Sequence, residues 1–413
     1  MRIAVVGGGL AGACCAHELA VSGKDVTLFD MGARGPGGRA SCRPAEGYCF
    51  DHGCQVLAPV DRQFQNLLSN WEARGIVTQW EGRVGTLEAA MGLFTPRHKT
   101  TADVGDGAPA GDEGDKHCES PDSSFCGSGF FGALQAAKLY VGAPGMNSIC
   151  ERLLAAEPNV TVETYCRVTR VDWDGEQRTW RLDGLRGQSL DHSKEGNTPY
   201  FLGTFDALVV ADVMAGTPGT PGTLNIDQEY HPLEKHFSAM AGVPPGSLFS
   251  AMIALPRALE GVPFDAAVVK GSTDLQWICR DSSKPGRGRD DGHECWVVVS
   301  SADFALRMVQ AMPLSIDGKY NPQTQVYLDS IAPKLLAAFQ DCVASFLNNG
   351  ENLQPTYLKA QRWGNAAPAT SLELPHECIH DPELNFAACG DFCSPEFGAH
   401  GALRSGHAAA NLI

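Results

Sequence analysis

Short runs of apolar residues, separated by glycine-rich turns, predict alternating strands and helices. Residues 3–6 (IAVV) are apolar throughout, as in a strand buried on both faces of a parallel sheet. Residues 10–22 then follow as a helix, and Gly23 stands just past its end, where glycine is common. Residues 25–30 predict a second strand that ends on an acid. This opening segment is therefore expected to form a β-α-β unit.

The same strand pattern returns later in the chain. Residues 205–212 (FDALVVAD) and 385–392 (NFAACGDF) indicate further buried parallel strands, and residues 401–413 indicate a terminal helix. Between them, residues 247–301 alternate apolar strands with turns, which predicts an antiparallel sheet, and residues 326–349 predict helices. The expected fold class is α/β: a Rossmann-type domain that is split along the chain and completed by its C-terminal segment, with an inserted substrate domain built on a mixed or antiparallel sheet.

These patterns divide the chain into two interleaved domains. The nucleotide-binding domain is expected to comprise residues 1–60, 140–215 and 355–413, and the substrate or cap domain residues 61–139 and 216–354. Residues 97–128 are polar, acidic and poor in large apolar side chains. Because such a composition cannot offset the entropy lost on ordering, we expect a mobile surface insertion there.

Composition and charge narrow the possible partners. The chain has 413 residues, 43% of them hydrophobic, enough for one large or two medium cores. Its formal net charge of −16 argues against nucleic acid or an anionic membrane surface. No apolar run reaches about 18 residues, so no transmembrane helix is expected. The first strand begins at Arg2, which leaves no room for a signal peptide. We expect the protein to be located in the cytoplasm or another reducing compartment. If a presequence has been removed, this compartment would include an organelle such as a plastid.

The 15 cysteines do not form the pattern of a disulfide framework. Their number is odd, and several, such as Cys14, Cys15 and Cys150, stand in apolar segments where cysteine behaves as a small hydrophobe. There is no C-x-x-C pair, and no histidine has the spacing of a metal ligand. We therefore expect reduced thiols and no metal.

The turn after the first strand carries a dinucleotide-binding pattern. Gly7, Gly9 and Gly12 form G-x-G-x-x-G: the first allows a tight turn, the second lets the backbone approach a pyrophosphate, and the third lets helix and strand pack closely. The helix begins at Leu10 and Ala11, so its N-terminal N–H groups and positive dipole end face the phosphates. Asp30 is placed to bind ribose hydroxyls. These residues predict a nucleotide site but leave NAD and FAD open.

The C-terminal segment points to FAD. A strand ending in Gly390-Asp391, followed by a loop and a helix that opens with Gly401 and Ala402, resembles the FAD-binding amine-oxidase superfamily, whose fold is similar to that of p-hydroxybenzoate hydroxylase. The resemblance implies that Asp391 binds ribityl or pyrophosphate-side groups and that the helix N-terminus faces the flavin pyrimidine edge. A helix dipole would stabilise negative charge on the reduced ring.

Other segments extend this resemblance. Gly37-Gly38-Arg39 fits the GGR of that superfamily, which implies that Arg39 braces the pyrophosphate, with Gly38 beside it. The Asp51-His52-Gly53 loop would pass beside the isoalloxazine, and the backbone of Val168 would pair with adenine. The S-G-G-C motif of covalent flavin sites is absent, so FAD is expected to be non-covalent.

Four short segments resemble the renalase-like subgroup of these oxidoreductases. They are FDHGCQVL, YVGAPGMNSI, WICRDSSKPGR and QRWGNAAP. The resemblance covers nearly the whole chain except the acidic insertion.

Four residues are candidates for the substrate site. Arg362 and Trp363 precede the last Rossmann strand, and Trp277 ends a strand of the inserted sheet, so all three are expected to line one cavity over the isoalloxazine. Arg362 would anchor an anionic donor; the alternative is a structural brace beside a buried tryptophan. His52 is the candidate general base, with local packing as the alternative. The basic loop at 282–287 would receive an anionic substrate or form a solvated turn.

Together these features favour an FAD-dependent oxidoreductase. It would take a hydride from a small reduced donor, either an amine or a dihydronicotinamide such as an isomer of NAD(P)H, and pass electrons to oxygen or another acceptor. The alternative is a non-catalytic FAD-binding scaffold or complex subunit. An NAD-only dehydrogenase is opposed by the GGR segment and the C-terminal Gly-Asp.

Overall fold

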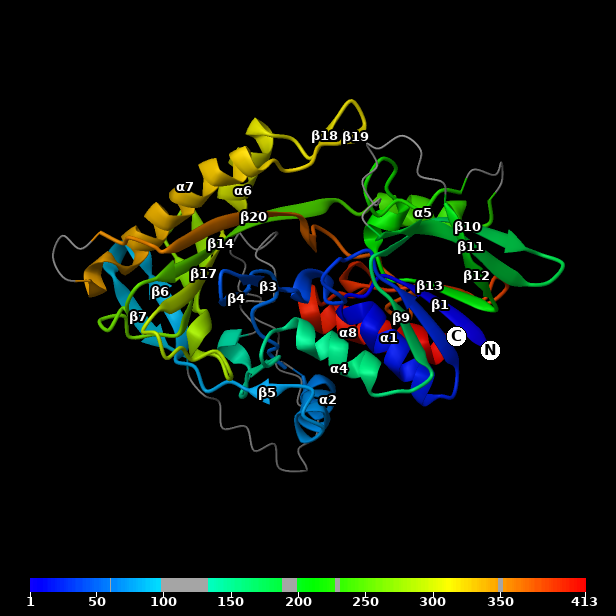
Figure 1. Cartoon of the computed structure of the whole chain (residues 1–413), viewed down its shortest axis with the longest axis horizontal. Helices are drawn as coiled ribbons and strands as arrows, with labels where there is room; N and C mark the ends of the chain where they lie inside the picture. Colours follow the sequence, from blue (N-terminus) through cyan, green and yellow to red (C-terminus); the bar gives the residue numbers. More distant parts are fainter. Residues whose placement is uncertain (60, 98–132, 188–198, 227–230, 348–351) are drawn as a thin grey trace, which may run out of the picture.

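Two sheets dominate the computed structural model, and they lie side by side with both chain ends next to the first (Figure 1). The structure describes residues 1–59, 61–97, 133–187, 199–226, 231–347 and 352–413. The predicted acidic insertion at 97–128 lies outside the described residues except for Arg97.

The first sheet has six strands in the order β21-β22-β13-β1-β2-β9. Neighbouring strands run parallel except β21, which is antiparallel to β22. The strands are β1 (Arg2–Val6), β2 (Asp25–Phe29), β9 (Val160–Glu163), β13 (Ala207–Val210), β21 (Ile379–Asp381) and β22 (Phe386–Ala388). Because β22 comes from the C-terminal segment and pairs with β13, the predicted split Rossmann-type domain is confirmed.

Different layers cover the two faces of this sheet. Alternate residues of a strand point to opposite faces, so Ile3 and Val5 enter one core and Ala4 enters another. The first core is formed with the helices α1 (Leu10–Val21), α4 (Asn147–Ala155) and α8 (Gly398–Leu412). The second is formed with a three-stranded antiparallel sheet and a helix: β10 (Cys166–Asp174), β11 (Thr179–Arg186), β12 (Tyr200–Phe205) and α5 (Glu234–Ala241).

The second sheet has seven strands in the order β20-β14-β17-β16-β15-β6-β7. They are β6 (Val84–Glu88), β7 (Leu93–Pro96), β14 (Pro245–Leu255), β15 (Ala266–Lys270), β16 (Leu275–Arg280), β17 (Glu294–Ser300) and β20 (Tyr357–Pro368). The strands are antiparallel except β15 and β6, so the sheet is mixed. The helices α6 (Ala302–Ala311) and α7 (Gln325–Val343) cover its outer face, where Phe249, Trp296 and Phe339 are fully buried.

The remaining described elements are shorter. They are α2 (Arg62–Ala73), β3 (Cys42–Ala45), β4 (Tyr48–Asp51), β5 (Thr78–Gln79), β8 (Tyr140–Val141), β18 (Ser315–Ile316) and β19 (Lys319–Tyr320). Single helical turns are η1 (Gly38–Ala40), η2 (Ala89–Met91), η4 (Val213–Gly216), η5 (Asp281–Ser283), η6 (Ala344–Phe346) and η7 (Asp391–Cys393). From α2, Phe64, Leu68 and Trp71 join the core of the first sheet, and so does Trp277 of β16. The two sheets therefore share one continuous core.

Two elements differ from the expectation. Residues 355–413 were all expected in the nucleotide-binding domain, but β20 pairs with β14 and forms an edge of the second sheet. Its polar composition hid it, because one of its faces lines a cavity rather than a core. The terminal helix begins at Gly398, not at residue 401.

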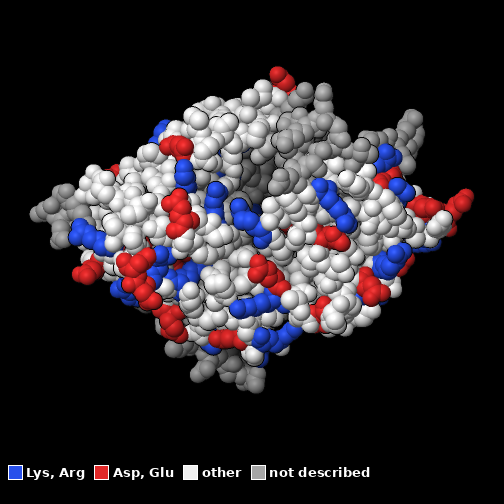
Figure 2. Space-filling model, in the orientation of Figure 1, with Lys and Arg blue, Asp and Glu red and all other residues white. Residues whose placement is uncertain are grey.

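Charged side chains of both signs are intermixed on the face shown in Figure 2. No broad basic surface is visible there, in keeping with the formal net charge of −16.

Candidate cofactor and substrate cavity

A cavity of about 1340 Å³ runs between the two sheets and is lined by both. It exceeds the roughly 300–1,000 Å³ of ordinary ligand pockets, as an extended dinucleotide requires. Twelve of the predicted site residues line it: Gly7, Gly9, Leu10, Ala11, Asp30, Gly38, Arg39, His52, Val168, Trp363, Gly390 and Ala402. Five do not: Gly12, Trp277, Arg362, Asp391 and Gly401.

The first glycine turn forms an open cradle. Gly7 has φ +106°, a conformation that favours glycine, and a Cβ on Gly12 would lie 1.9 Å from the carbonyl oxygen of Gly7. Gly9, by contrast, has no atom within 4 Å of where its Cβ would be. It also caps α1 without a side-chain hydrogen bond, so N–H groups at this helix end stay free for an anion. The turn therefore fits the backbone approach of a pyrophosphate.

Asp30 is held at the edge of this cradle. Its carboxylate accepts hydrogen bonds from the N–H groups of Gly8 (2.8 Å) and Gly32 (2.7 Å). Burial raises the pKa of Asp30, and these two N–H groups oppose the rise. The carboxylate is thus fixed in direction, and its binding to ribose remains a prediction.

Arg39 and Asp391 form a bidentate ion pair. Two hydrogen bonds of 2.7 Å join the guanidinium to the two carboxylate oxygens, and the N–H of Gly398 also donates to Asp391 (3.2 Å). Burial alone would lower the pKa of Arg39, but Asp391 raises it above its ordinary value. Arg39 lines the cavity while Asp391 lies behind it, so Asp391 orients the arginine. Asp391 does not line the cavity, so it is not placed for the direct cofactor contact that the sequence had predicted.

The N-terminal turn of α8 closes the far side of the cradle. Gly398, Ala399, His400 and Ala402 line the cavity, and Phe397 caps the helix without a side-chain hydrogen bond. Gly401 is packed behind them, since a Cβ there would lie 1.5 Å from the carbonyl oxygen of Glu396. The predicted helix N-terminus therefore does face the cavity, through residues that begin earlier than expected.

His400 is a lining residue that the sequence did not single out. Its ring stacks on Phe64 with centroids 4.3 Å apart, and its Nε2 lies 2.7 Å from Asp61. Burial lowers the pKa of His400, although Asp61 opposes this. No pattern around position 400 distinguished it from a helical surface residue.

His52 and Trp363 meet at the other end of the cavity. Their rings are 5.0 Å apart, and the indole N–H of Trp363 donates to the backbone carbonyl of His52 (2.9 Å). His52 is 2% exposed, and its Nδ1 has no hydrogen-bond partner among the described residues. Burial, with the charges of Arg43 and Arg34, lowers the pKa of His52 to about 4. The imidazole is therefore neutral at physiological pH but only a weak base, which does not favour the general-base role expected from the sequence.

The part of the wall that comes from the second sheet is uncharged. Leu248, Gln276, Val299, Gln361 and Asn365 line it from the second sheet. These residues were not among the sites predicted from the sequence. A period-two pattern in β20 could have found part of the set, because Gln361, Trp363 and Asn365 alternate along one face.

Arg362 and Trp277 lie elsewhere. The guanidinium of Arg362 donates to the carbonyls of Met312 (3.2 Å) and Asn321 (2.7 Å), on the opposite face of β20 from Trp363. Trp277 is fully buried in the core shared by the two sheets. The geometry favours the structural alternative for Arg362.

The loop at 282–287 is neither a substrate-binding loop nor a solvated turn. Lys284 and Arg287 are buried and paired with Asp51 and Asp281. These charges are neutralised by ion pairs inside the protein. The sequence could not show this, because Asp51 is 233 residues away from Lys284.

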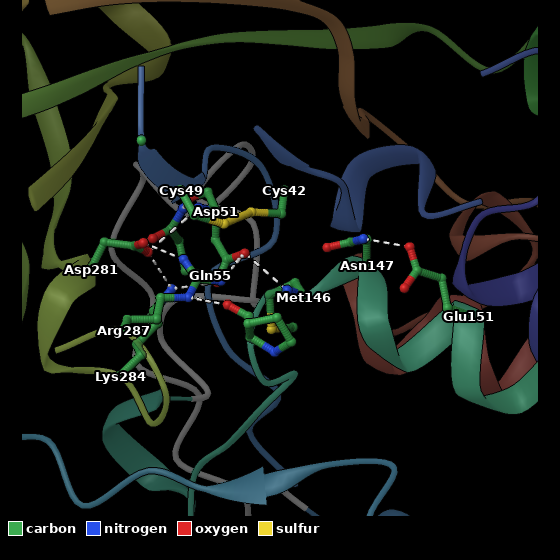
Figure 3. Close-up of a disulfide and its surroundings, with 12 residues drawn as sticks. Cys42, Cys49, Asp51, Gln55, Met146, Asn147, Glu151, Asp281, Lys284 and Arg287 are labelled. Carbon is green, nitrogen blue, oxygen red and sulfur yellow. Dashed lines mark hydrogen bonds and ion pairs between the residues drawn. A yellow bond between two sulfur atoms is a disulfide. The ribbon is translucent and has the colours of Figure 1, made fainter. Parts of the chain in front are cut away.

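One disulfide corrects the expectation of fully reduced thiols. Cys42 and Cys49 are bonded across the β3–β4 hairpin (Figure 3). Eleven other described cysteines are free. Of these, Cys389 and Cys393 are buried near the C-terminal Gly-Asp but do not line the cavity.

Two further properties concern the described part of the chain. No group of three or more His, Cys, Asp or Glu side chains there is arranged to hold a metal ion. None of its helices is long and apolar enough to cross a membrane.

Comparison with known proteins agrees with this architecture. Residues 5–71 match the family model of an NAD(P)-binding Rossmann-like domain. The whole chain is similar to the structure of a putative protoporphyrinogen oxidase from Exiguobacterium sp. 255-15, with 14% identity, a TM-score of 0.60, and 99% and 98% of the two chains covered. It is also similar to an oxidoreductase from Methanosarcina mazei, with 12% identity, a TM-score of 0.61, and 98% and 99% covered.

A third similar structure is putrescine oxidase bound to putrescine, with 12% identity, a TM-score of 0.58, and 100% and 98% covered. At these identities the comparisons show a common fold over the full chain.

Proposed function

We propose that this protein is an FAD-dependent oxidoreductase that takes a hydride from a small reduced donor. The observation that carries the proposal is one continuous cavity with two different ends. At one end are the glycine cradle, Asp30 and two helix N-termini. At the other are His52, Trp363 and an uncharged wall. Such a cavity can hold a dinucleotide along its length and leave room for a second molecule at its far end.

The residues present fit FAD. Gly7, Gly9 and the α1 N-terminus would hold the pyrophosphate with Arg39, while Asp30 would bind ribose and Val168 the adenine. The α8 N-terminus would face the ring. When bound, FAD would supply the hydride acceptor and pass electrons on to oxygen or another acceptor. Because no cysteine of the C-terminal segment lines the cavity, we propose non-covalent binding.

The residues at the far end would position the donor. Neutral His52 would act there as a wall and positioning residue, because its lowered pKa makes it a weak base. Trp363 would wall the donor site, and the strands β14 and β20 would exclude water from it. The lining side chains that the second sheet contributes carry no charge, so none of these would pair with an ammonium group; the carboxylates that line the cavity, such as Glu396, come from other segments. This favours a dihydronicotinamide, as in the renalase-like subgroup, over a cationic amine.

The rival proposal is a non-catalytic FAD-binding scaffold. It would need the glycine cradle but not the additional space lined by Trp363 and the second sheet. That space, which can hold a second molecule, therefore favours catalysis.

A donor screen on the purified protein tests the proposal. The protein should absorb as a flavoprotein and release FAD into the supernatant after acid precipitation. Under anaerobic conditions, NADH or its isomers should bleach the flavin, while putrescine should bleach it more slowly. Flavin that resists every donor would support the scaffold, and protein that binds no flavin after reconstitution would refute both proposals.

A further inference from the structure

Four buried charged side chains lie behind the loop that walls the donor end of the cavity. Asp51 ends β4, Asp281 opens η5, and Lys284 and Arg287 follow in the same loop (Figure 3). These four residues form the buried charge cluster. The side chains of Asp51, Asp281 and Lys284 are 0% exposed and that of Arg287 is 4% exposed. None of them lines the cavity, so the cluster is not itself a binding site.

Each carboxylate of the cluster is shared by both cations. Lys284 Nζ lies 2.9 Å from Asp51 and 3.0 Å from Asp281. Arg287 lies 2.6 Å from Asp51 and also pairs with Asp281. Burial alone would lower the pKa of Lys284, but Asp281 and Asp51 raise it above its ordinary value. Two positive and two negative charges therefore balance inside the protein.

The cluster joins three segments that are distant in sequence. The N–H of Met146 donates to Asp51 (2.9 Å), and Arg287 donates to the carbonyl of Pro144, so the loop before α4 is tied to it. Asp51 directly precedes His52 and Gly53, which line the cavity. On its other side, this short loop is held by the indole of Trp363. A Cβ on Gly53 would lie 2.1 Å from the carbonyl oxygen of Arg39, so the loop has little room to shift.

Buried ion pairs are a poor means of stabilising a fold, because apolar side chains of similar volume commonly do as well or better. Directional contacts from several sides do, however, select one backbone arrangement, and hydride transfer requires fixed geometry. We infer that the buried charge cluster is a positioning device that fixes His52 and Gly53 at the donor end of the cavity. The expected effect of the buried charge cluster on a bound flavin rests on the proposed function. Its expected effect on the loop at His52 and Gly53 does not.

Three variants separate positioning from simple stability. Lys284→Met removes one cation and leaves a carboxylate in excess. Asp51→Asn combined with Lys284→Met removes one charge of each sign, so charge balance returns but the Asp51–Lys284 link is still missing. The control is Lys359→Met, which breaks an exposed lysine–aspartate pair on β20, at 3.1 Å from Asp329.

Each variant is measured in three ways. They are the melting temperature, the amide hydrogen exchange of a peptide covering residues 52–56 in the protein as purified, and the visible spectrum after reconstitution with FAD. Lys284→Met should lower the melting temperature and speed exchange about tenfold, because local opening becomes easier. The double variant should recover most of the melting temperature yet keep the faster exchange and a flavin spectrum with broadened bands. The control should behave as the parent protein.

A double variant that restores stability, exchange and spectrum together would show that the cluster is merely structural and overturn the inference. So would parental exchange in a folded Lys284→Met protein. If Lys284→Met does not fold, the double variant alone shows whether the cluster positions the loop or only stabilises the fold. If the parent protein binds no FAD, the proposed function fails, and the exchange measurement still decides about the cluster.

Discussion

The two ends of the cavity are formed by different kinds of chemical groups. The nucleotide end uses backbone N–H groups and glycines such as Gly7 and Gly9, with Asp30 fixed by the same turn. The donor end uses residues far apart in the sequence, such as His52 in a loop and Trp363 on β20, which are 311 residues apart where the indole donates to the His52 carbonyl. In the proposed function, one end would therefore bind a common chemical group through local structure, while the other depends on how two sheets are placed. Changes at the first should alter cofactor affinity, and changes at the second should alter reduction.

The largest expected effect is a pH dependence that originates at the donor end. His52 has an ordinary pKa of 6.5 and a folded pKa of about 4. Because only the unfolded state takes up the proton between these values, its contribution is complete above about pH 6.5 and is lost as the pH falls toward 4. The loss amounts to about 3 kcal/mol. Urea unfolding at about pH 7.5 and about pH 4.5 should show a smaller loss of stability in His52→Gln than in the parent protein. Equal losses would mean that His52 is already charged in the folded state.

The nucleotide end should respond next. Asp30→Ala removes a carboxylate fixed by two N–H groups, and FAD affinity should fall by about 1–3 kcal/mol. The dissociation constant of FAD measures this, and the flavin that is bound should still be reduced at the parental rate. Asp25→Ala, at the exposed start of the strand that precedes Asp30, is the control. An unchanged dissociation constant would remove Asp30 from the cofactor site.

A variant of Arg362 tests whether this residue belongs to the donor end of the cavity. Arg362→Ala leaves the carbonyls of Met312 and Asn321 without their donor and should lower the free energy of unfolding by about 1–2 kcal/mol. Flavin reduction should keep its rate, because the side chain faces away from the cavity. Arg307→Ala, an exposed arginine paired with Asp274, is the control. Slower reduction with unchanged stability would instead restore the anchor predicted from the sequence.

The smallest effect is expected at Trp363. Trp363→Phe keeps an aromatic wall but removes the N–H that holds the His52 carbonyl, worth about 1 kcal/mol. Flavin reduction should slow by roughly fivefold while FAD affinity is unchanged. Trp173→Phe, on β10 outside the cavity lining, should change neither. If Trp363→Phe weakened FAD binding as much as it slowed flavin reduction, Trp363 would contribute to both ends, and the two ends would not be separate sites.

Sequence reasoning reached the nucleotide end because its determinants are local. The strand at residues 3–6, the glycines after it and Asp30 belong to one short unit, and each keeps its predicted position. The donor end was reached only in part. Trp363 was found through its motif, but the alternation that turns Arg362 away was not used, since β20 had not been recognised as a strand.

The buried charge cluster lay beyond such reasoning for a different reason. Lysine and arginine in a loop usually indicate a solvated turn, and their partner Asp51 comes from a hairpin far earlier in the chain. Pairing of this kind is decided when the sheets come together, not by the neighbouring residues.

The split of the nucleotide-binding sheet has a consequence for biosynthesis. β1, α1 and β2 are synthesised long before β22 and α8, and Asp391 follows its partner Arg39 by 352 residues. Until then the emerging chain exposes one edge of β13 and an uncovered face of α1, surfaces prone to non-native association. The proposed cofactor site would therefore be complete only after β22 and α8 have been translated.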